Sequence, residues 1–422
     1  MDFALNEEQS TLQSVLREFF AERADENAVR AQMAEPAGFD RALWKQMGTE
    51  LGLQSLAVPE EYGGAGYTFV ELGIVLEEMG RALTVSPFLA SAVMAPQLLL
   101  ALGDTAACER WLPGLASGDL VGTVALAEDS GRWSATESTV TVRSAGAGWV
   151  LDGHKYFVVD GAGADLVLVV ARAEDGVGVF AVESSAEGLG RTPLPTMDQT
   201  RKLARLSFTG TPAVRIDSAA AAAAVERMLD RTRIALAADA LGGSGRALDM
   251  AVEYAKVREQ FGRPIGSFQA IKHMCANMLV DLESSRSAVY YALWAAATDH
   301  EDEPIVAPMV KAHCVDAYLS TAGDNIQIHG GIGFTWEHPA HLYLKRAKSS
   351  QALLGGSDEH PNLEGWAIWG QVGGQRVGGP TFGRRSRCPE FLDLVNNTSE
   401  LRRVVQLDAR WRVHPQCLIR PD

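Results

Sequence analysis

The spacing of apolar residues changes twice along this chain of 422 residues and divides it into three parts. From Glu7 the apolar positions repeat with the period of an amphipathic helix, and Asn6 is well suited to cap that helix. Between residues 120 and 208, short β-branched runs recur about every ten residues with glycine-rich breaks, which is typical of strands. Six consecutive alanines after Ser218 then begin a second helical region. The order is therefore helical, β and helical.

These changes predict an α+β protein of several domains. We expect an N-terminal all-helical domain over residues 1–118, a middle β-barrel or β-sandwich domain over 119–216 and a helical bundle over 217–360. Asp217 and Ser218 are predicted to cap the first bundle helix. Two bundle helices, at 219–258 and 267–298, are longer than usual, which suggests that the bundle also packs against other subunits.

The last segment, 361–422, differs from the rest of the chain. It holds nine Arg, no Lys and six acids, and it shows no sustained hydrophobic period. We interpret it as an appended, poorly packed tail, with an out-of-frame translation as the extreme case and a family-specific extension as the alternative.

Composition excludes several classes of protein. There are 38 Lys and Arg against 53 Asp and Glu, a net charge of −15, which argues against a nucleic-acid partner. No apolar run approaches the roughly 20 residues of a membrane span, and the acidic N-terminus does not resemble a signal peptide, so we predict a cytoplasmic protein. Five cysteines lie far apart without a C-x-x-C pair, so neither a metal site nor a disulfide framework is expected.

Two turns carry groups that suit phosphate. The segment 327–334, QIHGGIGF, ends a predicted helix in a glycine turn with exposed backbone amides; a plain helix C-cap is the alternative reading. The segment 258–269, REQFGRPIGSFQ, joins the two long helices and offers a guanidinium, an aromatic ring and an amide. Arginine binds a diphosphate through bidentate, permanently charged hydrogen bonds.

Over roughly residues 1–360, this domain order and these motifs resemble the acyl-CoA dehydrogenase family of flavoenzymes. The likeness also includes VPEEYGG at 58–64, LDGHKYF at 151–157 and GFTWEHP at 333–339. The resemblance implies a four-helix bundle as the C-terminal domain and a homo- or heterotetramer that binds FAD between subunits. It also implies an acyl-CoA substrate whose α proton goes to a base and whose β hydrogen leaves as hydride to flavin N5. The usual electron acceptor is an electron-transfer flavoprotein.

Site residues follow from the resemblance position by position. The residues implied to reach a neighbouring subunit's FAD are Arg258, Phe261 and Gln269, and those implied to contact its adenosine-diphosphate half are Gln327, Gly330 and Gly331. Phe157 matches the aromatic residue that packs against the flavin ring; a plain core aromatic on a strand is the alternative.

The sequence departs from the family where a base is needed. A glutamate is customary at one of two positions, and here these hold Leu354 and Thr232. Asp239 lies seven residues beyond Thr232, about two turns along the same helix, and is the candidate base; a helix-face acid paired with Lys or Arg is the alternative. Glu337 and Asp358 are weaker candidates.

Several residues that the family uses to contact flavin and substrate are also missing from this sequence. The substrate loop at 127–134 keeps Glu128 and offers Ser130, but it has lost the customary Gly-Ser-Asp. Val159 replaces the threonine that usually donates to flavin N5, and Gly356 replaces an FAD-contacting threonine.

Two hypotheses remain open. The chain is either an acyl-CoA dehydrogenase with its own unusual base, such as Asp239, or a non-catalytic, half-site subunit that scaffolds FAD in a heterotetramer, as in bacterial relatives acting on sterol side-chain CoA esters. A flavin oxidase or monooxygenase on the same fold is a third possibility that no feature favours.

Overall fold

The structure is a computed structural model that describes residues 5–35, 38–146 and 148–355. It confirms the predicted fold class, with an N-terminal helical region, a middle β-rich region and a C-terminal helical region. The predicted tail, 361–422, lies outside the described residues. The N-terminal helices are α1 (Glu7–Arg23), α2 (Glu26–Met33), α3 (Arg41–Thr49), α4 (Phe69–Ala82), α5 (Ala95–Leu102) and α6 (Thr105–Ser117), with a π-helical segment, Leu89–Met94, before α5.

Local capping residues set where these helices begin. The predicted cap is confirmed, because the Asn6 side chain accepts from the Gln9 backbone N–H and the Gln9 side chain accepts in return from the Asn6 backbone. Thr68 and Glu71 form the same arrangement at the start of α4. Each cap satisfies amides that would otherwise have no partner in the first turn.

The middle domain is a small closed barrel. Its strands are β1 (Gly122–Ala125), β2 (Thr141–Ala145), β3 (Gly148–Val159), β4 (Leu166–Ala173), β5 (Gly176–Glu183), β6 (Leu189–Pro193) and β7 (Leu203–Ile216). The sheet closes because β5 pairs with both β7 and β4, while β4 also pairs with β1 and β2. Closure pairs β2, β3, β4, β5 and β7 on both sides, while β1 and β6 each pair with one neighbour.

The end of β3 points toward the helices. The register with β7 shifts between Lys155 and Val158, and Phe157 and Asp160 have φ values of 55° and 53°. Val158 then packs into the barrel interior, whereas Val159 joins the core shared with the helices. Because of this irregular register, Val159 and Asp160 lie at the boundary between the barrel and the helices.

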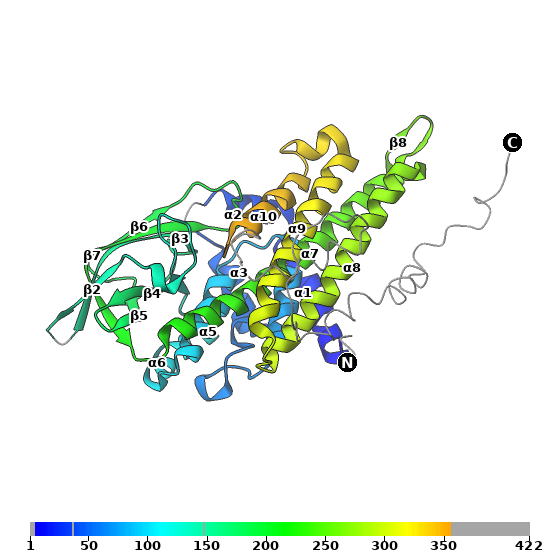
Figure 1. The fold of residues 1–422 in the computed structure, drawn as a ribbon. Coiled ribbons are helices and arrows are strands. Elements are labelled where there is room, and N and C mark those ends of the chain that lie inside the picture. The colour runs from blue at the N-terminus through cyan, green and yellow to red at the C-terminus, as the bar shows by residue number, and fades with distance from the viewer. Residues whose placement is uncertain (1–4, 36–37, 147, 356–422) are drawn as a thin grey trace, which may run out of the picture.

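The C-terminal region consists of α7 (Ala221–Val257), α8 (Gln269–Ala297), α9 (Glu303–His329) and α10 (Ala340–Ala352), with a short hairpin, β8 (Glu259–Gln260) and β9 (Arg263–Pro264), between α7 and α8. In Figure 1 the strands gather on one side, and α7, α8 and α9 run together away from them to the hairpin. The predicted cap of α7 is wrong: Ala220 is the N-cap, and the Asp217 N–H donates to Asp104 instead.

Two glycines allow α4 and α7 to touch backbone to backbone. A Cβ on Gly80 would lie 2.0 Å from the Asp239 carbonyl oxygen, and one on Gly242 would lie 1.7 Å from the Glu77 carbonyl oxygen. No larger residue fits at either crossing point. The crossing fixes Asp239 beside the end of α4. Among the described helices, none carries an apolar stretch long enough to cross a bilayer.

Candidate functional site

The predicted base, Asp239, lies buried where the three domains meet. Its carboxylate accepts a hydrogen bond from Arg201 Nη2 at 3.0 Å, and Arg346 Nη1 lies 3.9 Å from its other oxygen. Both guanidiniums are about as deeply buried as the acid itself. Because its oxygens are held by two cations, this geometry favours the interpretation of Asp239 as a paired acid rather than a free base.

A small cavity adjoins this ion cluster. Its volume is about 30 Å³, enough for roughly one water molecule and too small for an acyl thioester. The lining residues are Leu76, Met79, Thr84, Ser86, Phe88, Leu89, Val159, Asp160, Thr200, Arg201, Asp239 and Arg346. The structure therefore brings Val159, which was predicted to lie near flavin N5, to the same small cavity as Asp239.

The two customary base positions hold buried, non-ionisable side chains. Leu354 is fully buried with a φ of 61°, and Lys311 Nζ holds the adjoining backbone by donating to the Gln351 and Gly355 carbonyls at 2.9 and 2.6 Å. Thr232 is also fully buried and donates to the Met228 carbonyl at 2.6 Å. Glu337 is exposed in the turn before α10, and Asp358 and Gly356 lie outside the described residues.

Sequence reasoning missed Asp160. Asp160 follows β3 directly and lines the cavity. Burial raises the pKa of Asp160 to about 7, against the opposing charges of Arg201, Arg346 and Lys202. The sequence could have identified Asp160 by its position next to Val159, because a carboxyl beside a predicted flavin contact is a candidate functional group.

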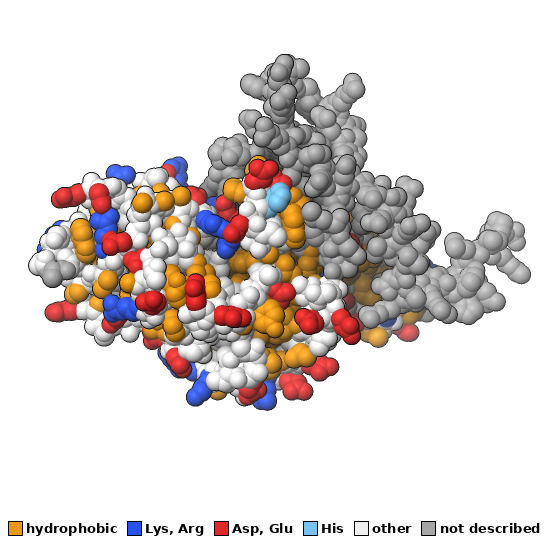
Figure 2. Space-filling view, turned by 90° about the horizontal axis from the view of Figure 1, so that it is seen from below, with side chains coloured by type: hydrophobic (Ala, Val, Ile, Leu, Met, Phe, Trp, Pro, Cys, Tyr) orange, Lys and Arg blue, Asp and Glu red, His pale blue; other side chains and the backbone are white. Residues whose placement is uncertain are grey.

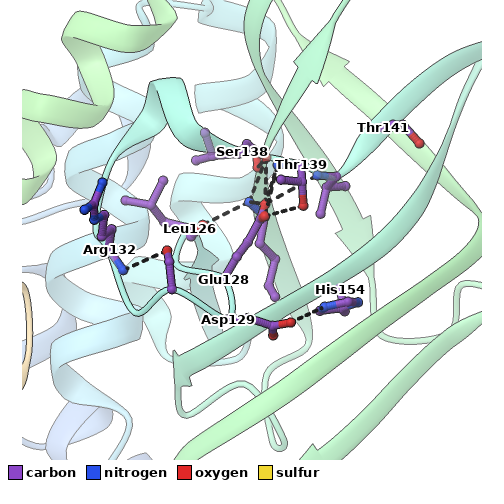
Figure 3. A network of polar contacts seen from close by, with 12 residues as sticks. Leu126, Glu128, Asp129, Arg132, Ser138, Thr139, Thr141 and His154 are labelled. Carbon is purple, nitrogen blue, oxygen red and sulfur yellow. Dashed lines mark hydrogen bonds and ion pairs between the residues drawn. The ribbon is translucent and has the colours of Figure 1, made fainter.

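Glu128 serves an internal network rather than a substrate surface. Lys155, fully buried on β3, donates from Nζ to Glu128 Oε1 at 2.7 Å, to Ser138 Oγ at 2.9 Å and to the Leu126 carbonyl at 2.9 Å. The Thr139 backbone N–H donates to the same carboxylate at 2.8 Å. Figure 3 shows Glu128 turned inward to these partners, while Asp129 points away to His154. The acid therefore anchors the start of the loop.

This network makes the loop sensitive to acid. Burial acts to raise the pKa of Glu128, but hydrogen bonds from Lys155 and Thr139 outweigh it and hold the pKa at about 2, below the ordinary 4.5. The unfolded chain binds this proton at higher pH than the folded chain, so we expect stability to fall as pH drops from 4.5 toward 2. We expect the free energy of unfolding, measured in urea across this pH window, to decline less steeply for Glu128→Gln than for Glu137→Gln. Glu137 belongs to a surface ion pair and serves as the control. Equal slopes would contradict the assignment.

The rest of the predicted loop lies beside Phe157. Ser130 is exposed, and its Oγ accepts from the Arg132 N–H at 3.3 Å. A Cβ on Gly131 would lie 3.9 Å from the Phe157 ring, which is 36% exposed. Phe157 is therefore partly exposed beside the loop and not a fully buried core aromatic.

The predicted FAD contacts for a neighbouring subunit lie exposed at the far end of the bundle. The exposed residues are Arg258, Phe261, Gln269, Gln327, Gly330 and Gly331. Tyr254, one turn before Arg258, stacks on His329 with ring centroids 4.3 Å apart, which brings the two turns to the same end. Gly330 has φ 65° and ψ −144°, a conformation that favours glycine, and space around both glycines is open.

Charged side chains on one face of the molecule form no single-sign patch. On the face shown in Figure 2, acidic and basic side chains are interspersed and no broad basic area is visible. Within the described ranges, no three His, Cys, Asp or Glu side chains are arranged to hold a metal ion.

Known families match the chain in the same three parts. Residues 6–119 match the acyl-CoA dehydrogenase N-terminal domain, 123–210 its middle domain and 222–362 its C-terminal domain. The chain belongs to the acyl-CoA dehydrogenase family. Membership makes it an oxidoreductase of the acyl-CoA dehydrogenase class, in a family that generally uses FAD.

Relatives of this acyl-CoA dehydrogenase include heteromeric ones. Acyl-CoA dehydrogenase IpdE2 of Mycobacterium tuberculosis is 36% identical over 348 residues, covering 82% of this chain and 93% of that protein. The solved Tcur3481–Tcur3483 steroid ACAD has a TM-score of 0.76 at 32% identity, covering 87% of this chain and 99% of its own. The ChsE4–ChsE5 complex from Mycobacterium tuberculosis has a TM-score of 0.77 at 28% identity, covering 89% and 100%.

The residues fit FAD at one of two places. The exposed guanidinium and amides at the end of the bundle suit a diphosphate carried by a neighbouring subunit. By contrast, the cavity beside Val159 has a volume of only about 30 Å³, and the Val159 side chain has no donor for the predicted contact with flavin N5.

Proposed function

We propose that this acyl-CoA dehydrogenase acts as the half-site subunit of a heterotetramer, completing the FAD site of a second, base-bearing subunit. The ion pair at the candidate base carries the proposal, because Asp239 is bonded to Arg201 beside a cavity of only about 30 Å³. Leu354 and Thr232 supply no carboxylate in its place.

The chain's own residues would bind and orient the shared cofactor. Arg258 is suited to grip the diphosphate with two parallel hydrogen bonds, and the open glycine turn at Gly330 and Gly331 lets a ligand approach the backbone closely. Gln327 and Gln269 add amide groups on the same end of the bundle. FAD bound there supplies the acceptor for the β hydride of an acyl-CoA thioester.

The substrate class and assembly follow from the relatives. Heteromeric and steroid-type names recur among them, which supports a sterol side-chain CoA ester as the substrate of the assembled enzyme. An electron-transfer flavoprotein is proposed as the electron acceptor, since the family customarily uses one.

Co-purification with a homologous subunit tests this proposal. We expect the chain alone to carry substoichiometric flavin and to show no acyl-CoA-dependent dye reduction, and both to appear when a base-bearing acyl-CoA dehydrogenase subunit is added. A full flavin complement and turnover by the chain alone would overturn the proposal in favour of an autonomous dehydrogenase.

Asp239→Asn separates the same two hypotheses within the assembled enzyme. If Asp239 is only a paired acid, turnover of the complex should stay within about twofold of the parent. If it is the base, turnover should fall by roughly 10²–10⁴. Flavin content and oligomeric state should be measured in parallel, so that a folding defect is not taken for a lost base.

A further inference from the structure

A cavity of about 370 Å³ lies between the N-terminal and the C-terminal helices. Helices α1, α2, α4, α7 and α10 all contribute to its wall, and the exposed residues Ala21, Asp25 and Glu26 stand where it meets solvent. Small-molecule sites have volumes of about 300–1,000 Å³, so this cavity suits a small ligand. Its wall contains none of the residues implied to contact FAD or substrate, so the function proposed above leaves it unexplained.

One part of the wall is apolar. The buried apolar side chains that line it are Phe20, Ala24, Val29, Leu83, Met250 and Leu342. A hydrocarbon group placed against them would be removed from water, which is favourable in proportion to the area covered. This part of the cavity therefore suits the apolar tail of a ligand.

Two guanidiniums in the wall are paired with acids at the protein surface. Arg81 Nη2 donates to Asp249, and Arg246 Nη1 donates to Glu253 at 3.4 Å. The side chains of these acids are 46% and 66% exposed, and neither acid lines the cavity. Exposed ion pairs contribute little stability because water and salt screen them. An anionic ligand can therefore compete for both guanidiniums.

The same two guanidiniums lie close to one hydroxyl group. The Tyr343 hydroxyl, on α10, donates to the Arg81 carbonyl at 2.8 Å and also lines the cavity. Burial raises the pKa of Tyr343 to about 12, and the nearby charges of Arg246 and Arg81 oppose this rise. The two cations are thus near enough to each other to share one carboxylate through charged hydrogen bonds.

The acids in the wall are already engaged within the protein. Glu78 is buried and accepts from Arg17 Nε and Nη2 at 3.0 and 2.6 Å. Asp25 caps the start of α2, and Glu26 accepts from Arg30 Nε at 2.8 Å. The wall thus holds three arginines and three acids, but only the two guanidiniums paired at the surface keep donors for a ligand.

We propose that this cavity is a binding site for a small carboxylic acid with an apolar tail. Arg81 and Arg246 hold the carboxylate, and the tail lies against Phe20, Met250 and Leu342. A CoA thioester has no free carboxylate at its acyl carbon, so the ligand class is free acids and not the substrate of the proposed reaction.

Isothermal titration of the full chain with hexanoate, in the absence of flavin and acyl-CoA, tests this site. We expect hexanoate to bind. Hexanamide has nearly the same shape without the charge, and it should bind roughly ten- to a hundredfold more weakly, because charged hydrogen bonds are stronger than neutral ones. Hexylamine, which carries the opposite charge, should bind more weakly still.

Two variants locate the binding within the cavity. Arg246→Gln should weaken hexanoate binding roughly tenfold or more, whereas Arg227→Gln, which breaks a surface ion pair with Asp299 elsewhere on α7, should leave it unchanged. Ala21→Phe places a ring at the cavity from an exposed position on α1 and should abolish binding. Ser14→Phe, two turns earlier on the exposed surface of α1, is its control.

Equal affinities for hexanoate and hexanamide, or for the Arg246 variant and the parent, would overturn the proposal. Tighter binding of hexylamine would show that the acids in the wall dominate and would contradict it too. A parent chain that does not bind hexanoate at all also excludes the site. Because no partner, flavin or CoA ester enters these titrations, their failure would leave the heterotetramer proposal as it stands.

Discussion

Replacing Arg258 by alanine should strip flavin from the assembled enzyme while leaving the subunits folded and associated. The side chain is exposed in the isolated chain, so its removal should cost little stability. Loss of a charged hydrogen bond to a diphosphate is worth about 1.5–3 kcal/mol, or roughly ten- to a hundredfold in affinity. Flavin content after gel filtration and titration with FAD would measure the change.

Arg263→Ala is the matched control, because Arg263 lies in the same hairpin but stacks on Phe268 of its own chain, with the guanidinium 4.2 Å from the ring centroid. Its flavin affinity should stay near that of the parent. Equal affinities for the Arg258 variant and the parent would remove the basis for a shared FAD site at this turn.

Replacing Arg201 by methionine should be among the most destabilising single changes in the barrel. Arg201 is 6% exposed and makes the one short bond to Asp239. Its loss leaves a buried carboxylate with only Arg346 at 3.9 Å, and breaking a buried pair in this way typically costs about 3–5 kcal/mol. Urea unfolding, followed by circular dichroism, would give the change in free energy.

A double-mutant cycle shows whether the cost comes from the stranded charge. Adding Asp239→Leu to Arg201→Met removes both ions, and we expect most of the lost stability to return, because apolar replacements of a buried pair are often neutral. If the double variant is as unstable as the sum of the singles, the two side chains do not act as a pair.

Much of the architecture was predictable because it depends on local rules. Helix caps such as Asn6 act within one turn, and strand alternation reflects burial on one face, so domain order followed from spacing alone. The cap predicted at Asp217 and Ser218 failed because α7 begins only at Ala221, which leaves Ala220 at the N-cap position. Strand β6 was missed because Leu189–Pro193 is short and carries no β-branched run.

The candidate site was less predictable because its chemistry is set by residues far apart in the sequence. From the sequence alone, Asp239 could be interpreted as a base or as a paired acid. The structure favours the paired acid because it places Arg201, 38 positions away, beside it. Likewise, the sequence places Glu128 in the predicted substrate loop but does not show that Lys155 donates a hydrogen bond to it. Asp160 becomes a candidate only when the residues lining the cavity are known, because burial is what raises the pKa of its carboxyl.

The contact of α4 with α7 at Gly80 and Gly242 joins the N-terminal and C-terminal helices with no layer of side chains between them. With backbone against backbone, these helices have no side-chain layer that could slide or repack, so the N-terminal and C-terminal helices behave as a single rigid frame. The barrel, by contrast, meets these helices through side chains, such as Arg201 with Ser350 and Lys202 with the Met33 carbonyl. In the heterotetramer proposed above, these joined helices would give the partner subunit a fixed surface at the end of the bundle.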